Sequence, residues 1–381
     1  MGGEAILNER TLRETTIVEL RLGRVAYERG RKPIRFGAHQ FRYAALVAMV
    51  RAGDGSVGIG ANWAQLDEEL SYAAAVRPTL SAAIVGRDAL SPHQAGAACQ
   101  AEAHRIGAGR AGAAVEMALW DLAGRMSGVP VSRLLGRRRQ ELPSYAISAE
   151  DFFFESSTQY VELVQRFVAE GFNACKLHLW GKPKEDLAAC RAIRQAVGDD
   201  VVLMLDPAGR YSREDALRVG QAIAEMGFVR LEDPLPPDDA AGYRWLASRI
   251  PVPVVVNESL RWNLEQCRVA AQNGVVQGFR MEVGRAGLGE ALRFCAMADA
   301  NGAEIDIAAF APRLGLEMCF ELALASPATR WFEHHEAMGL EAIPGVEAGF
   351  RIEGGVARPL DLPGLGCRID WPELDRHCEW A

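Results

Sequence analysis

The feature that most restricts the fold is a regular alternation of short apolar segments with amphipathic ones, which begins near Leu142. Eight of the apolar segments have the length of buried strands: PSYAIS, NACKLHL, VVLMLD, FVRLE, VPVVVNE, VVQGFRM, AEIDIA and RWFE. Helical segments such as REDALRVGQAIAEMG lie between several of them. Repeated strand–helix units with nearly continuous apolar strands are typical of a parallel sheet, and eight strands favour a closed barrel. The pattern alone also allows an open, doubly wound sheet.

A different pattern precedes these units. The segments ETTIVELRLG and YAALVAMVRAGDGSVGIGANW predict strands, and GDGS supplies the turn of a hairpin. Gly53, Gly55 and Gly58 spell G-x-G-x-x-G, but the following residues continue as a strand and do not open the helix that a dinucleotide site needs. Helices follow, and the last of them, AGAAVEMALWDLAGRMS, is ended by Gly128.

The length of 381 residues exceeds that of one small domain. We therefore expect an N-terminal α+β domain over residues 1–140 and a barrel over residues 141–345. Residues 346–381 are rich in turns, and we expect this C-terminal segment to pack back on the first domain.

Charge and cysteine usage narrow the range of partners. The formal net charge is −8 without long blocks of one sign, which argues against a nucleic-acid surface. The eight cysteines form no C-x-x-C pair and lie in apolar segments, so we expect reduced core thiols. The first residues lack an apolar signal core, and no apolar run approaches the roughly 18 residues of a membrane span. These observations predict a cytoplasmic protein without a membrane partner.

Three consecutive predicted strands end in an acid: Asp206, Glu232 and Glu258. The spacings are 232 − 206 = 26 and 258 − 232 = 26 residues, one strand–helix unit each, so the three carboxylates should meet at one rim of the sheet. Three such anions repel one another unless a cation lies among them. Oxygen ligands favour Mg²⁺, which would leave coordination positions for a substrate. The alternative is that each acid caps a helix or pairs with an arginine.

Lys176 and His178 lie two residues apart on the strand before Asp206, so their side chains should point to the same side. A base beside a metal-bound carboxylate can remove the proton α to that carboxylate, because the cation stabilises the enediolate that forms. We expect the cation to lower the pKa of both residues and to leave a neutral base at pH 7. The alternative for His178 is a structural histidine bonded to a neighbouring strand.

Several motifs together resemble the enolase superfamily, and within it the mandelate racemase subgroup, which includes the muconate lactonizing enzymes. They are ALWDLAGRMSGVPVSRLLG before the barrel, LMLDPA, RLEDPL and NESL within it, and DLPGLG near the end. The resemblance implies an α+β capping domain followed by a (β/α)7β barrel of the TIM type. It also implies a Mg²⁺ ion on Asp206, Glu232 and Glu258, and abstraction of a proton α to a substrate carboxylate.

The chain departs from the family pattern at two places. The Lys-x-Lys pair of the family falls on Lys176 and His178, so the second lysine is replaced by histidine. The family's His-Asp dyad on the opposite face falls near Met281 and Ala308, neither of which can move a proton. Racemisation of the ordinary two-base kind is therefore disfavoured.

Other family positions carry polar residues here. The resemblance implies that Glu333 hydrogen-bonds the substrate carboxylate as a neutral acid whose pKa is raised by burial, and a salt-bridged acid at the bottom of the barrel is the alternative. Arg280 and Asp306 lie around the vacated dyad with Glu282 and are candidates for substrate binding, although strand alternation cannot direct all three inward. The segment RKPIRFGAHQF resembles the family's specificity loop and makes Arg35 and His39, with Lys32, further candidates; a solvated basic loop is the alternative.

These expectations give three hypotheses for the function. The first is a Mg²⁺-dependent lyase that dehydrates a sugar acid or 2-hydroxy acid, with Lys176 or His178 as the base. The second is a racemase, epimerase or lactone cycloisomerase of the same superfamily, and the third is a metal- and ligand-binding relative that has lost catalysis. The expected partner is a small carboxylate, and the resemblance suggests a homo-oligomer.

Overall fold

The computed structural model describes residues 13–26, 34–36, 39–41, 43–65, 69–148, 156–257, 264–309, 311–335 and 342–381. The structural statements below concern these ranges.

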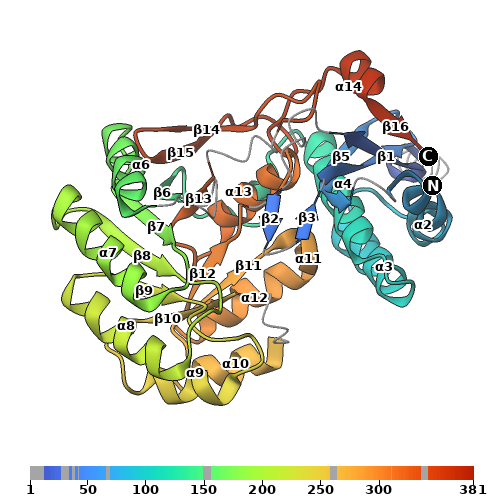
Figure 1. Ribbon diagram of the computed structural model, residues 1–381. Coiled ribbons are helices and arrows are strands. Elements are labelled where there is room, and N and C mark those ends of the chain that lie inside the picture. The colour runs from blue at the N-terminus through green and yellow to red at the C-terminus, as the bar shows by residue number, and fades with distance from the viewer. Residues whose placement is uncertain are drawn as a thin grey trace.

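All eight predicted strands are present, and they form one parallel barrel (Figure 1). They are β6 (Leu142–Ile147), β7 (Ala174–His178), β8 (Val202–Asp206), β9 (Arg230–Glu232), β10 (Val254–Asn257), β11 (Gly278–Met281), β12 (Glu304–Ile307) and β13 (Phe332–His334). Neighbours in sequence pair in order from β6 to β12, while β13 pairs with β6 and contacts β12. The sheet is therefore closed, and the open doubly wound alternative is excluded.

Seven connections of the barrel carry a helix that covers the apolar outer face of the strands. These helices are α6 (Ser157–Ala169), α7 (Pro183–Val197), α8 (Arg213–Glu225), α9 (Ala240–Ala247), α10 (Leu264–Gln272), α12 (Leu288–Ala300), preceded by the short α11 (Val283–Ala286), and α13 (Gly315–Ala325). The first strands described after β13 are β14 (Phe350–Glu353) and β15 (Val356–Pro359), which form a hairpin that pairs with β6 through β15. The architecture is the predicted (β/α)7β barrel.

An antiparallel sheet in the order β16-β1-β4-β5 forms the N-terminal unit. Its strands are β1 (Ile17–Ala26), β4 (Tyr43–Ala52), β5 (Val57–Gln65) and β16 (Cys378–Trp380), the last of which follows α14 (Trp371–His377). The predicted hairpin joins β4 to β5, with Gly55 at φ +89° in its turn. Helices α2 (Glu69–Ile84), α3 (Pro92–Arg105), α4 (Gly109–Ser127) and α5 (Val131–Leu134) follow. Strands β2 (Ile34–Phe36) and β3 (His39–Phe41) form a separate two-stranded sheet.

Helix α4 packs its apolar face on the N-terminal sheet and ends at Gly128, whose φ of +68° is left-handed. Two buried acids on α4 accept hydrogen bonds from distant backbone groups. Glu116 accepts from the amides of Leu288 and Gly289, both at 2.9 Å, at the first turn of α12.

Asp121 binds three donors: the amides of Ile59 (2.9 Å) and Leu365 (2.7 Å), and Arg125 Nε (2.7 Å). Since Leu365 belongs to the C-terminal segment, Asp121 joins that segment to the hairpin and to α4. The predicted domain boundaries at residues 140 and 345 stay predictions.

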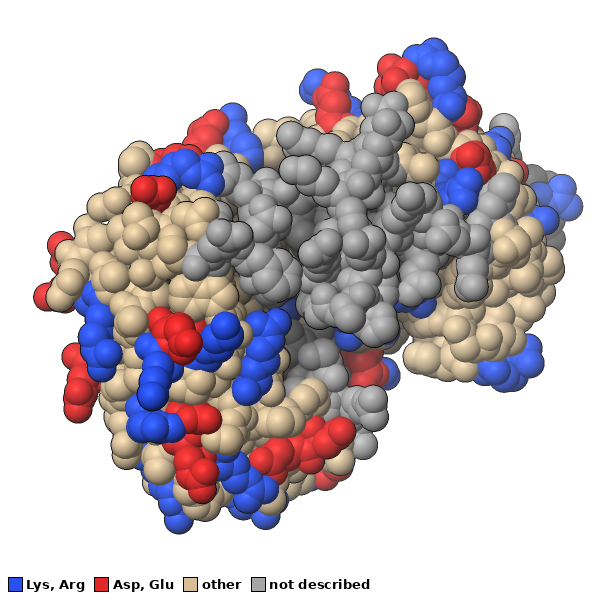
Figure 2. All heavy atoms as spheres, viewed as in Figure 1, with Lys and Arg blue, Asp and Glu red and all other residues tan. Residues whose placement is uncertain are grey.

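Three further expectations concern the molecule as a whole. All eight cysteines are buried and none is in a disulfide bond, as predicted. Basic and acidic side chains are interspersed on the face drawn in Figure 2. No helix among the described residues has the length and apolar character needed to cross a bilayer.

Candidate active site

The interior of the barrel carries an unusual number of charged side chains. Strand alternation sends Lys176, Arg230, Glu232 and Arg280 inward from β7, β9 and β11, where they form ion pairs with one another or with Glu333. These side chains are almost completely buried. Buried charges cost free energy unless they are paired, so the pairing within this cluster decides what each group can do.

Glu333, on β13, is the centre of the cluster. Its Oε1 accepts hydrogen bonds from Arg280 Nη2 (2.7 Å), His335 Nε2 (2.7 Å) and the Ala309 amide (3.2 Å). Its Oε2 accepts from Tyr145 Oη (2.7 Å), Arg280 Nε (3.0 Å) and Lys176 Nζ (3.1 Å). Six donations to one carboxyl group satisfy both of its oxygens and favour the ionised form.

The neutral state expected for Glu333 is therefore wrong. Burial alone would raise the pKa of Glu333, but the charges of Arg280, Lys176 and His335 lower it well below its ordinary value. The group is a carboxylate with its lone pairs already occupied, in line with the salt-bridge alternative.

Lys176 also differs from expectation. Its Nζ lies 3.1 Å from both oxygens of Glu232 as well as from Glu333. Burial would lower the pKa of Lys176, but Glu232 and Glu333 raise it above its ordinary value. The ammonium group is thus held in its charged form by two carboxylates and is poorly placed to accept a proton.

His178 is the better candidate for a neutral base. It pairs with Asp206 across the β7–β8 ladder, and its Nε2 lies 3.1 Å from Asp206 Oδ2. Burial, and next the charge of Lys176, lower the pKa of His178 well below its ordinary value. The direction is the expected one, but its causes are burial and Lys176, and the effect of a cation stays a prediction. Its backbone amide donates to the Ser148 hydroxyl at 3.0 Å, which fixes the end of β7 against β6.

A second buried ion pair, between Arg230 and Asp306, lies deeper in the barrel. Arg230 forms an ion pair with Asp306, and Tyr145 Oη lies 3.2 Å from Asp306 Oδ2. The Tyr145 ring has cations near its face, with Lys176 Nζ 5.3 Å and Arg230 Cζ 5.2 Å from its centroid. The sequence analysis assigned neither Arg230 nor Tyr145, although Arg230 stands two residues before Glu232 and alternation alone would have directed it inward.

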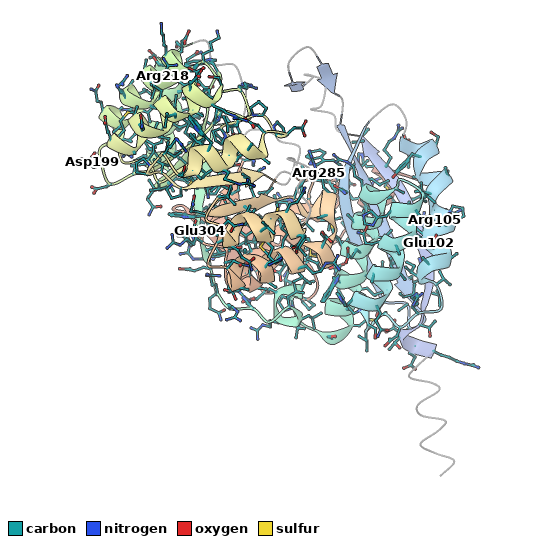
Figure 3. All side chains as sticks on the ribbon, turned by 90° about the horizontal axis from the view of Figure 1, so that it is seen from below. Glu102, Arg105, Asp199, Arg218, Arg285 and Glu304 are labelled. Carbon is teal, nitrogen blue, oxygen red and sulfur yellow. The ribbon has the colours of Figure 1, made fainter. Side chains whose placement is uncertain are left out.

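Of the three polar candidates near Met281 and Ala308, Arg280 and Asp306 point into the barrel and Glu282 does not. Glu282 pairs at 2.6 Å with Arg285, which is half-exposed and labelled in Figure 3. Asp306 is engaged by Arg230, and Arg280 by Glu333, so both contribute to the buried network. Met281 and Ala308 are adjacent, since the Ala308 amide donates to the Met281 carbonyl at 2.7 Å.

The donor set at the rim suits a hard cation. Glu232 carries a pKa lowered to about 2, since Lys176, Arg280 and Arg230 outweigh its burial. Burial and the negative charge of Glu232 raise the pKa of Asp206 well above its ordinary value. This repulsion between two buried carboxylates is what a divalent ion relieves, and oxygen ligands match Mg²⁺.

Other predicted site residues lie outside the described part of the chain. Glu258 and Lys32 are not described, and for Arg35 and His39 only the backbone of β2 and β3 is. Among the described residues, no three His, Cys, Asp or Glu side chains gather as a ligand group.

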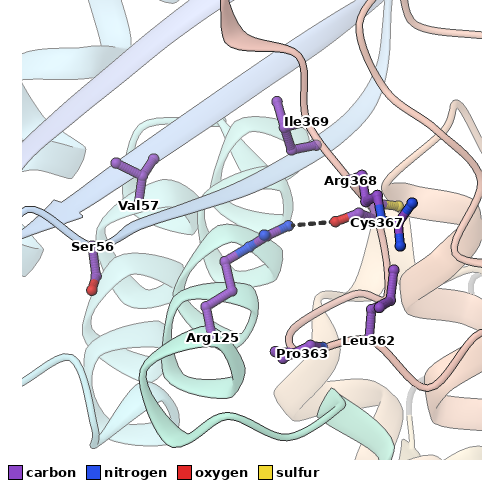
Figure 4. Close-up of a pocket in the computed structure, with 8 residues that line it drawn as sticks. All are labelled: Ser56, Val57, Arg125, Leu362, Pro363, Cys367, Arg368 and Ile369. Carbon is purple, nitrogen blue, oxygen red and sulfur yellow. Dashed lines mark hydrogen bonds between the residues drawn. The ribbon is translucent and has the colours of Figure 1, made fainter.

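Two surface pockets lie among the described residues. One, of about 200 Å³, lies outside β13 and is lined by Glu333, His335, Arg313 and Arg351 among others. The other, of about 560 Å³, lies between the β4–β5 turn, α4 and residues 362–369; there Arg125 donates to the Cys367 carbonyl at 3.1 Å (Figure 4). The second pocket contains none of the predicted site residues.

Curated relatives of the chain catalyse several reactions. It is 28% identical to the L-talarate/galactarate dehydratase of Salmonella typhimurium, over 72% of this chain and 69% of the relative. It is 27% identical to the L-Lys-D/L-Arg epimerase of Methylococcus capsulatus (84% and 90% covered). It is also 27% identical to the 3,6-anhydro-alpha-L-galactonate cycloisomerase of Streptomyces coelicolor (88% and 91% covered). Its relatives thus include lyases, epimerases and isomerases.

Solved structures show the same architecture. A protein from Bordetella bronchiseptica described as a mandelate racemase superposes with a TM-score of 0.83 at 25% identity, covering 96% of this chain and 95% of that one. An L-talarate/galactarate dehydratase variant liganded with Mg and L-glucarate superposes with a TM-score of 0.79 at 22% identity, covering 96% and 91%.

Family models match both parts of the chain. The model of the mandelate racemase / muconate lactonizing enzyme N-terminal domain covers residues 19–136, and the model described as enolase C-terminal domain-like covers residues 159–374. The chain therefore belongs to the enolase superfamily, in its mandelate racemase / muconate lactonizing enzyme subgroup.

Proposed function

We propose that the chain is a Mg²⁺-dependent lyase that removes the proton α to the carboxylate of a sugar acid or 2-hydroxy acid and eliminates water. The observation that carries the proposal is the difference in surroundings between Lys176 and His178, the two basic residues on β7. Lys176 is held by Glu232 and Glu333, each at 3.1 Å, whereas His178 stands at the strand end beside Asp206. One base on one strand suits an elimination better than an inversion.

The scheme gives a role to four residues that the structure describes and to Glu258. His178 accepts the α-proton, and Lys176 places a fixed positive charge where the substrate carboxylate gains negative charge. Asp206 and Glu232, with Glu258, would hold Mg²⁺. When bound, the ion stabilises the negative charge that develops on the substrate carboxylate.

A screen with defined acids tests the proposal. The purified protein with Mg²⁺ is incubated in D₂O with galactarate, L-talarate and L-glucarate, which the dehydratase relatives suggest, and the mixtures are followed by NMR. We expect a 2-keto product from at least one acid. His178→Asn should abolish its formation, while His104→Asn, on exposed surface of α3, should not. Unchanged turnover in His178→Asn would contradict the proposal.

A second candidate is an epimerase, which the long alignment with the L-Lys-D/L-Arg epimerase favours. The same experiment separates the two. Deuterium in recovered substrate of inverted configuration, without a 2-keto product, would replace the lyase by an isomerase.

A further inference from the structure

Asp186 is a buried carboxylate on α7, in the helical layer of the barrel. It lies in the first turn of the helix, and its exposed fraction is 0%. Its Oδ1 accepts a hydrogen bond from the backbone amide of Trp180 at 3.1 Å, and its Oδ2 accepts one from the hydroxyl of Tyr211 at 2.6 Å. Burial raises the pKa of Asp186 to about 6, so the group is ionised at pH 7 and can only accept. Both of these partners are therefore donors.

The two donors come from the connections that follow β7 and β8. Trp180 stands two residues after His178, and Tyr211 stands five residues after Asp206. Because the strands of a parallel barrel end at the same rim, both connections leave the rim that carries His178 and Asp206. Asp186 thus joins the segment after the candidate base to the segment after a candidate metal ligand.

A second contact joins the same two segments. Arg210 Nη1 donates to the Leu179 carbonyl at 3.4 Å. The stem of Arg210 also lies against Gly181, where a Cβ would overlap the arginine side chain. Gly181 has a φ of +70°, a conformation that glycine adopts without strain. The two connections therefore touch over residues 179–181 and 210–211, and the Asp186 carboxylate completes this contact.

The same set of contacts reaches the segment after Glu232. The amide of Gly209 donates to the Asp233 carbonyl at 2.7 Å, and the amide of Tyr211 donates to the Pro234 carbonyl at 3.2 Å. The connections after β7, β8 and β9 are thus held together beyond the ends of their strands.

This support matters because the strand ladder itself ends at the candidate site. His178 and Asp206 form the last pair of the β7–β8 ladder, and their side chains meet there with 3.1 Å between Nε2 and Oδ2. Beyond that pair, the relative position of the two strand ends depends on the contacts of the segments that follow. The bonds of Asp186 to Trp180 and Tyr211 are among these contacts.

We propose that Asp186 and Tyr211 are positioning residues that keep the ends of β7 and β8 aligned, so that His178 meets the α-proton of a substrate held beside Asp206. The inference rests on the proposed role of His178 as the base. The two residues act through the backbone of the strand ends. A base displaced by about 1 Å can cost about 10²-fold in rate. The loss should appear in kcat, because binding of the substrate does not require an aligned base.

Tyr211→Phe tests the proposal, because it removes one hydroxyl group and keeps the ring. Tyr243→Phe is the matched control: Tyr243 is also buried, and its hydroxyl donates to the Leu235 carbonyl at 2.8 Å, within the β9–α9 unit. Galactarate is the first probe, or the acid of the screen above that gives product. We expect Tyr211→Phe to lower kcat by about 10- to 100-fold with little change in KM. Tyr243→Phe should keep the wild-type kcat. Equal losses of kcat in the two variants would show a general effect of a lost buried hydrogen bond and overturn the proposal.

A pair of variants at Asp186 separates positioning from an effect of its charge. In Asp186→Asn, the amide oxygen can accept from the Trp180 amide, and the amide nitrogen can donate to the Tyr211 hydroxyl. This variant should therefore retain most of the wild-type kcat, whereas Asp186→Ala loses both bonds and should lose as much as Tyr211→Phe. Equal losses in Asp186→Asn and Asp186→Ala would assign the effect to the charge and overturn the proposal.

Hydrogen–deuterium exchange followed by mass spectrometry needs no substrate. We expect faster exchange in peptides that cover residues 179–182 and 208–211 in Asp186→Ala and Tyr211→Phe, and unchanged exchange there in Tyr243→Phe. Exchange at the wild-type rate in Asp186→Ala and Tyr211→Phe would overturn the proposal. If the wild-type protein turns over no acid, the proposed function fails, whereas the exchange rates still test whether Asp186 holds the two strand ends.

Discussion

Replacing Glu333 by glutamine should destabilise the fold far more than the size of the change suggests. The substitution removes a charge that faces Lys176 at 3.1 Å and Arg280 at 2.7 Å. At these separations each attraction amounts to about 5–6 kcal/mol for an effective dielectric constant of about 20. The desolvation of the charged groups offsets much of this attraction, and Lys176 retains its ion pair with Glu232 in the variant. Breaking a buried pair by removing one partner typically costs about 3–5 kcal/mol, which is the loss of unfolding free energy that we expect at pH 7.

The loss of unfolding free energy caused by Glu333→Gln should become smaller at low pH. The pKa of Glu333 is lowered in the folded protein, so its contribution is complete above the ordinary glutamate pKa of about 4.3 and fades as the pH falls through the lower, folded value. The stability difference between the wild type and Glu333→Gln should therefore be constant between pH 6 and 8 and shrink below about pH 4. Urea denaturation in EDTA, followed by far-UV circular dichroism at several pH values, measures this difference.

Glu304→Gln is the matched control. Glu304 pairs with Arg330 on the surface and is labelled in Figure 3, and exposed pairs contribute at most about 1 kcal/mol. A Glu333→Gln protein that unfolds at the wild-type urea concentration at pH 7 would refute the view that this carboxylate neutralises the buried cations.

Three further predictions concern Asp121, Gly124 and Asp206. Asp121→Ala removes three hydrogen bonds from buried or partly buried donors, and should lower the unfolding free energy in urea by about 2–4 kcal/mol. Gly124→Ala places a Cβ 2.8 Å from Gly364 Cα and should cost about 1–3 kcal/mol, whereas Gly109→Ala on the same helix meets nothing within 4 Å and should be neutral or slightly stabilising. Asp206→Asn should abolish any rise in melting temperature with added Mg²⁺, as measured by differential scanning fluorimetry.

The barrel could be predicted from the sequence because its signals are local. Each strand is a short apolar run, and each is separated from the next by a periodic helical segment or by turn residues. That Asp206 and Glu232 end β8 and β9 could be predicted for the same reason, since an acid that ends an apolar strand is visible without knowing its neighbours. Alternation along β7 likewise directs Lys176 and His178 inward.

The ionisation states could not be predicted, because they depend on partners from other strands. Glu333 is anionic only because Arg280 from β11 and Lys176 from β7 converge on it, and no pattern within RWFEHH shows that. Burial alone would favour the neutral, protonated form of Glu333. Arg230 and His335 could have been found by alternation from Glu232 and Glu333, but their roles required the closed barrel that brings Asp306 and Glu333 to them.

The pairing of β16 with β1 has a consequence for biosynthesis. Arg24 of β1 and Glu379 of β16 form an ion pair although 355 residues separate them. A nascent chain emerging from the ribosome therefore presents β1 as an open edge until the barrel segment has been translated. The N-terminal sheet is thus translated first but completed among the last, because β16 must pair with β1. We expect a chaperone that shields exposed strand edges to bind the nascent chain at β1.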